Sequence, residues 1–162
     1  MIRESLFFCL LIAGLFTHCG SGQVPHPGEE EEEEEEAAAV AEAVFSYQIQ
    51  HRPLERNQEI YFLQIEGNKD PTAALMKRLT DKKYSVQFGS KATVLQGLVE
   101  DKDTKKFGIL LVIRNRTCAS VNQCEVEASI KSGSDSVEGW HYELDKENNQ
   151  WVVKKAQLSS IS

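Results

Sequence analysis

Two cysteines late in the chain, Cys118 and Cys124, have the type and spacing that most directly predict chemistry. They flank the pentapeptide ASVNQ at the junction of two expected strands, where facing residues lie about 4.5–5.5 Å apart at Cα, within disulfide reach. A zinc site needs four ligands, and no histidine lies nearby to complete one; redox pairs usually have two intervening residues. We therefore predict a Cys118–Cys124 disulfide in an exported protein, worth about 2 kcal/mol because its loop is short.

Cys19 is a second candidate, as a site of lipid attachment. It follows an unbroken apolar run from Leu6 to Phe16, which has the length of a signal-peptide core and is too short to cross a bilayer. Cleavage before Cys19 would leave it acylated as a membrane anchor, whereas cleavage after Gly22 would discard it. His18 opposes the first route, because lipoprotein signals usually have a small residue there. Both routes predict an exported protein, either anchored in the cell envelope or secreted.

Acid–base catalysis is the third chemistry that the side chains could support. Asp70, Tyr84 and Glu127 could act in an apolar pocket, but general acid–base work needs groups that converge and have tuned pKa values. The aromatic residues Trp140, Tyr142 and Trp151 could line such a pocket, although aromatic side chains in strands more often form the core. We assign no catalytic residue from the sequence.

No cofactor or metal site is predicted. The chain has no nucleophile elbow, no glycine-rich phosphate loop and no calcium loop. The pair Asp101 and Asp103 is followed by lysines and predicts a hairpin turn. The histidines share no spacing that suits a metal; they are His18, His26, His51 and His141.

Charge is confined to one tract of this 162-residue chain. Glu29–Glu36 carry eight negative charges, whereas the formal net charge is −7, so the rest of the chain is nearly neutral. A neutral domain lacks the basic stripe that binds phosphates, which argues against a nucleic-acid partner. We predict a signal peptide over 1–22, an acidic tether over 23–36 and one domain over 37–162.

The elements that must position these side chains follow from periodicity. Ala37–Gln50 has an apolar stripe at helical spacing, and the preceding glutamates favour the positive end of the helix dipole, so the acidic tract could enter the first turn. Residues 59–66 are apolar enough for a strand but could also form an irregular buried segment, and Asp70 with Pro71 predicts the start of a second helix. Six short strands with polar turns follow, which predicts an antiparallel meander in an α+β fold, with the two helices covering one face of a curved sheet. The strands are expected at 84–88, 92–100, 107–115, 124–132, 140–145 and 151–158.

The order of VFSYQI, IYFLQIEGNKDPTAALMKRL, DKDTKKFGI and WHYELDKENNQWVVKKAQLSSIS resembles a loose group of uncharacterised bacterial exported proteins, many of which look like lipoproteins. The similarity covers about residues 40–162. By architecture the chain looks like the cystatin-like or NTF2-like families, which implies helices on a curved sheet and no agreed activity. No functional residue can be carried over, since the Q-x-V-x-G inhibitory loop of cystatins is absent and LQGLVE matches it only superficially.

Three hypotheses of function follow. The first is a non-catalytic binding module, tethered or secreted, whose partner is a protein or a small ligand. The second is an NTF2-like enzyme, which requires a buried ionisable group in an open pocket on the concave side of the sheet. The third is a protease inhibitor, which requires an exposed apolar hairpin. The first is favoured, because no set of ionisable residues converges in the sequence; fold analogy alone supports the other two.

Overall fold

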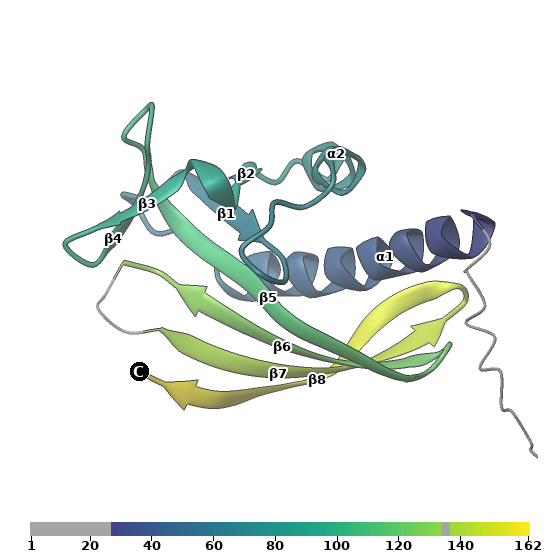
Figure 1. Ribbon diagram of the computed structural model, residues 1–162. Helices are drawn as coiled ribbons and strands as arrows, with labels where there is room; N and C mark the ends of the chain where they lie inside the picture. Colours follow the sequence, from purple (N-terminus) through teal and green to yellow (C-terminus); the bar gives the residue numbers. More distant parts are fainter. Residues whose placement is uncertain (1–26, 134–136) are drawn as a thin grey trace, which may run out of the picture.

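The computed structural model describes residues 27–133 and 137–162 (Figure 1). The predicted signal peptide 1–22, with Cys19, and the first residues of the predicted tether lie outside the described residues. The helices are α1 (Pro27–His51) and α2 (Ala73–Asp81), with a short 3-10 helix η1 (Gly89–Lys91). The strands are β1 (Ile60–Gln64), β2 (Val86–Phe88), β3 (Ala92–Leu95), β4 (Leu98–Asp101), β5 (Phe107–Ser120), β6 (Gln123–Lys131), β7 (Glu138–Glu147) and β8 (Gln150–Ile161).

The strands form one mixed sheet in the order β2-β1-β5-β6-β7-β8, with the β3–β4 hairpin attached to β5. The meander β5–β8 is antiparallel, as predicted. However, the prediction of a wholly antiparallel sheet is wrong at β1, which pairs in parallel with β2 and β5, for example at Tyr61↔Ile109. The chain between β1 and β2 contains α2, and a crossover of this kind is what parallel neighbours require.

Helix α1 begins at Pro27, ten residues before the predicted start at Ala37, and therefore includes most of the predicted tether 23–36. Proline suits the first helical turn, and carboxylates near a helix N-terminus interact favourably with its dipole. Cations from other elements also offset repulsion between the glutamates. Glu35 forms an ion pair with Arg78 of α2, and Glu36 with Lys146 of β7.

The hydrophobic core lies between α1, α2 and the concave face of the sheet (Figure 1). Helix α1 contributes Val40, Val44 and Phe45, each at most 1% exposed. Tyr142 and Trp151 are buried in the same core, which confirms the core interpretation of these aromatic residues, and the half-buried Trp140 packs against it. None of the helices in the described ranges is long and apolar enough to cross a membrane.

The start of α2 differs from the prediction in detail. Thr72, not Asp70, is the N-cap, and its hydroxyl oxygen accepts a hydrogen bond from the Leu75 amide at 3.2 Å. The Asp70 carboxylate instead accepts hydrogen bonds from the backbone amide and the hydroxyl of Ser90. Asp70 therefore ties the loop before α2 to the helix η1.

Candidate functional site

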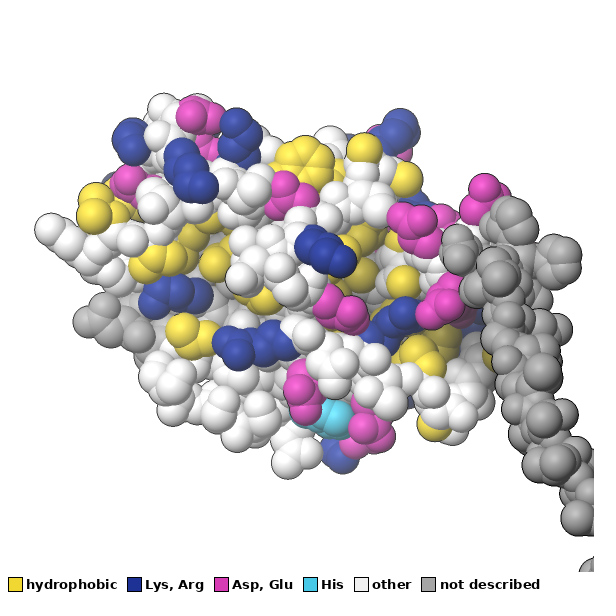
Figure 2. Space-filling model, viewed as in Figure 1, with side chains coloured by type: hydrophobic (Ala, Val, Ile, Leu, Met, Phe, Trp, Pro, Cys, Tyr) yellow, Lys and Arg dark blue, Asp and Glu magenta, His cyan; other side chains and the backbone are white. Residues whose placement is uncertain are grey.

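A cleft of about 180 Å³ lies between α1, the β1–α2 connection and the concave side of β5 and β6. We call it the α1 cleft. Its charged lining residues are Glu34, Glu66, Lys69 and Arg116. Figure 2 shows hydrophobic side chains exposed between acidic and basic ones on this face of the molecule. The apolar residues that line the cleft are Ala37, Ala38, Val40, Ala41, Ile65, Leu75, Ile113 and Val126.

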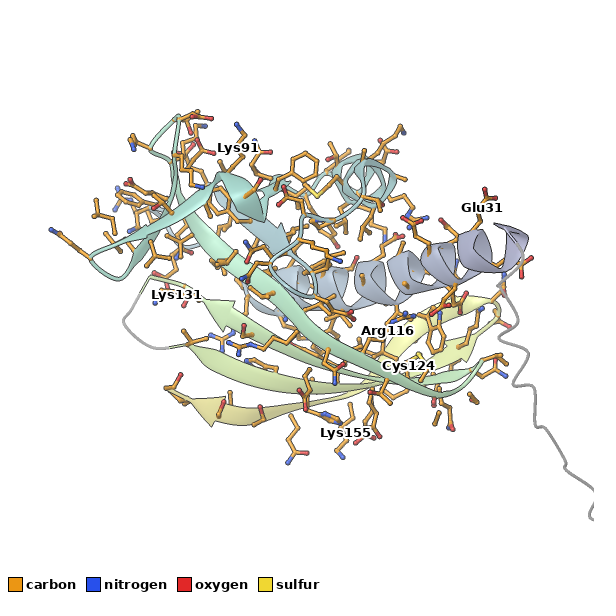
Figure 3. The ribbon with its side chains drawn as sticks, in the orientation of Figure 1. Glu31, Lys91, Arg116, Cys124, Lys131 and Lys155 are labelled. Atoms are coloured by element: carbon orange, nitrogen blue, oxygen red, sulfur yellow. A yellow bond between two sulfur atoms is a disulfide. The ribbon has the colours of Figure 1, made fainter. Side chains whose placement is uncertain are left out.

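Arg116 is the charged residue that β5 contributes to the α1 cleft, and Figure 3 places it between the sheet and α1. The side chain is half-buried and also lines an adjoining cavity with Lys146 and Trp151. Among residues 27–133 and 137–162, no side chain or backbone group forms a hydrogen bond or ion pair with its guanidinium. A half-buried guanidinium with free donors is suited to bind an anionic group.

Glu36 connects α1 to the strands β7 and β8, and it lines the same cavity as Arg116, Lys146 and Trp151. Its carboxylate accepts hydrogen bonds from Lys146 Nζ and Trp151 Nε1, each at 2.7 Å. Burial raises the pKa of Glu36, but the hydrogen bonds from these two side chains and the charges of Lys146 and Arg116 outweigh it and lower the pKa below its ordinary value of 4.5. Glu36 escaped the sequence analysis because it was assigned to the tether. A signal was present, since Glu36 stands one helical turn before the core residue Val40.

The carboxylate of Glu36 should control a pH transition that Trp151 reports. The folded pKa is lowered, so the stabilisation is present above about pH 4.5 and is lost as the pH falls through the folded value. In a Trp140→Phe background, where Trp151 is the remaining tryptophan, we expect its fluorescence to change below pH 4.5. Adding Glu36→Gln should abolish this change, and a transition that persists in the double variant would contradict the assignment.

The predicted disulfide between Cys118 and Cys124 is present in the structure. The two residues face each other across β5 and β6 with their Cα atoms 4.0 Å apart. Cys118 is exposed, whereas Cys124 is buried in the core. The bond closes the end of the β5–β6 hairpin and lines the cavity that adjoins Arg116.

The three residues considered for acid–base catalysis do not come together. Asp70 binds Ser90, and the Tyr84 hydroxyl accepts a hydrogen bond from Gln50 Nε2 at 2.9 Å. Glu127 is exposed on β6, and none of the three lines the α1 cleft. Within the described part of the chain, no group of three histidine, cysteine, aspartate or glutamate side chains could hold a metal ion.

A buried ionisable group is present, but it belongs to the core. Burial raises the pKa of Tyr142 to about 12. Its side chain is 1% exposed, and the hydroxyl accepts a hydrogen bond from Gln48 Nε2 at 3.3 Å. Tyr142 does not line the α1 cleft, so it does not supply the acid or base that the enzyme hypothesis requires.

The β3–β4 hairpin exposes apolar side chains at a second place, near the end of the molecule opposite the N-terminus of α1 (Figure 1). Its two-residue turn consists of Gln96 and Gly97, which both have positive φ and suit a tight hairpin. Val94, Leu95 and Leu98 are 47%, 57% and 39% exposed. The protease-inhibitor hypothesis requires an exposed apolar hairpin of this kind.

No family model, curated protein or solved structure matches the chain.

Proposed function

We propose that the chain is a non-catalytic binding domain and that its α1 cleft holds a small apolar group that carries a carboxylate. The observation that supports this proposal is the guanidinium of Arg116, which lines an apolar cleft without a hydrogen-bond partner among the described residues. The charge of Arg116 interacts with Glu36 and lowers its pKa, but the half-buried guanidinium forms no hydrogen bond with a described residue, so an anionic ligand would satisfy its donors. Arginine also binds carboxylates through two parallel hydrogen bonds.

The volume of the cleft limits the size of the ligand. A cavity of about 150 Å³ lined by apolar residues accommodates benzene, so the α1 cleft at about 180 Å³ has room for a group of roughly six to eight heavy atoms. Glu34 and Glu66 also line the cleft, and both are exposed. Their negative charges disfavour a second anionic group, so the ligand is a monocarboxylate.

A pair of probes that differ only in charge tests the proposal. Isocaproate should shift the amide NMR signals of residues that line the α1 cleft, and isocaproamide should bind at least tenfold more weakly, because it lacks the charge that Arg116 recognises. The Arg116→Gln variant should bind both probes equally weakly.

Arg114→Gln is the matched control for this experiment. Arg114 precedes Arg116 on β5 but does not line the α1 cleft, and its Nε donates to the Ser129 hydroxyl. This variant should keep the preference for isocaproate. If neither probe shifts any signal from the cleft, or if Arg116→Gln retains the preference, the assignment of the cleft is wrong.

We also propose that the protein is exported and that its finer fold is a cystatin-like or NTF2-like roll. The Cys118–Cys124 disulfide supports export, because such bonds persist in oxidising compartments outside the cytosol. Attachment through an acylated Cys19 and release after Gly22 both stay open. The intact mass of the mature protein distinguishes them, since it reports the cleavage site and any acyl chains.

The second candidate function is protease inhibition, and the exposed β3–β4 hairpin favours it. Leu95 and Leu98 face each other at the tip and could enter a partner's cleft. The enzyme hypothesis lacks comparable support, because Asp70 and Tyr84 lie in the loops before α2 and before β2, whereas Glu127 lies on β6.

A further inference from the structure

Strand β5 continues beyond the end of its neighbour β1 and leaves one edge without a partner. The parallel pairing of β1 with β5 ends at Gln64↔Val112. The chain then reverses in a tight turn, closed by backbone hydrogen bonds in both directions between Ile65 and Lys69. Figure 1 shows β5 running on past β1.

We call residues Asn115–Ser120 of β5 the free edge. Their other side is paired with β6. On the side that β1 vacates, no strand in the described ranges 27–133 and 137–162 pairs with them. Six residues of strand span about 20 Å, and their outward N–H and C=O groups form a template for another extended chain. Irregularities lie at both ends, and Asn115–Cys118 between them keeps a regular register.

The free edge lies directly beside the α1 cleft. Arg116 belongs to both, since it is on the free edge and its side chain lines the cleft. Ile113, two residues before the free edge begins, also lines the cleft. A strand added at the free edge would therefore direct every second side chain toward the cleft.

We propose that the free edge and the α1 cleft together bind an extended peptide segment of a partner protein, as an added strand of the sheet. This inference rests on the proposed function and specifies its ligand. The carboxylate and the apolar group of that ligand would belong to two different side chains of one peptide. A glutamate or aspartate of the peptide binds Arg116, and an apolar residue two positions away fills the cleft. Backbone pairing supplies affinity, and the two side chains supply specificity.

The charges near the free edge limit the peptide to a single acidic residue. Glu32, Glu33 and Glu36 of α1 line the cavity beside Arg116, Cys118 and Ser120, and their negative charges disfavour further acidic side chains there. The free edge carries one formal charge, that of Arg116, and no acidic residue. Glu34 and Glu66 lie elsewhere on the lining of the cleft and disfavour acidic side chains there. An acidic residue of the peptide is thus favoured opposite Arg116, with apolar residues on either side along the same face.

A palindromic peptide tests the proposal without assuming a strand direction. The probe is acetyl-TLTETLT-amide, which places leucines two residues before and after a central glutamate, and its affinity is measured by isothermal titration calorimetry. The glutamine version, acetyl-TLTQTLT-amide, should bind at least tenfold more weakly. Arg116→Gln should remove this difference, and Arg114→Gln should keep it.

Backbone methylation decides whether the peptide pairs as a strand. Amides of alternate residues in a strand point to opposite edges, so one peptide is N-methylated at leucine and glutamate and another at the threonines. We expect one of the two to bind like the unmodified probe and the other to lose at least tenfold in affinity. Both binding, or neither binding, would overturn strand addition.

The probes also separate this inference from the proposed function. If isocaproate binds in the cleft but the peptide does not, the proposed function stands and the peptide inference is wrong. If neither binds, both are wrong. Sedimentation equilibrium at the titration concentration completes the test, because a dimer that the peptide does not dissociate would assign the free edge to a second copy of the chain and overturn the inference.

Discussion

Replacing Phe45 with alanine should lower the free energy of unfolding by about 4 kcal/mol. Phe45 lies in the C-terminal half of α1 and is fully buried in the core that the helix shares with the sheet. Removing the ring forfeits its transfer from water and leaves a cavity beneath the helix. Urea unfolding followed by circular dichroism measures the loss as a lower midpoint at an unchanged slope.

Glu31→Ala is the control for Phe45→Ala on the same helix. Glu31 is exposed, so its removal should change the free energy of unfolding by less than about 0.5 kcal/mol. A loss below about 1 kcal/mol for Phe45→Ala would mean that α1 does not cover the concave face of the sheet. Helix α1 would then not form one wall of the α1 cleft, and the proposed function would be wrong.

The faces of the later strands could be predicted because burial follows a period of two. In β6 the sequence places Val126, Ala128 and Ile130 on one face, and all three are buried in the core. The same alternation places Ser129 on the solvated face with Glu125, but Ser129 is 3% exposed. The Arg114 side chain donates a hydrogen bond to its hydroxyl from the neighbouring strand, and so contributes to its burial.

The position of β1 could not be predicted in the same way. The alternation of apolar and polar residues indicates which side of a strand is buried, but it does not indicate which strands pair with it. Chain order suggested a meander, whereas β1 lies between β2 and β5 in the sheet. The helix boundary was missed for a different reason: eight adjacent glutamates predict repulsion, and the compensating cations Arg78 and Lys146 are distant in sequence.

One part of the candidate site could be predicted from the sequence and another part could not. Cysteine spacing was sufficient to predict the disulfide between Cys118 and Cys124, because both are close in sequence. Arg116 was not predicted, and an irregularity of register explains why. Counting by twos from the buried Ile113 places Asn115 inward, but the register with β6 shifts between these two residues and Arg116 lines the cleft instead.

Gly108→Ala should destabilise the protein by about 3 kcal/mol, because it tests the pairing that sequence periodicity missed. A Cβ atom at Gly108 would lie 2.1 Å from the carbonyl oxygen of Ile60 and 2.8 Å from Cε2 of Phe62. The first contact is with backbone, so β1 would have to move away from β5. Urea unfolding measures the loss, and hydrogen exchange should show faster exchange of the β1 amides.

Gly67→Asn is the control for Gly108→Ala. Gly67 has a φ of 70° with no atom within 4 Å of a Cβ, and asparagine tolerates this conformation, so the change should cost less than about 1 kcal/mol. If Gly108→Ala were equally mild, β1 could not lie in parallel beside β5 at this register. The end of β1 at Gln64 defines where the free edge of β5 begins, so that result would also remove the basis for strand addition.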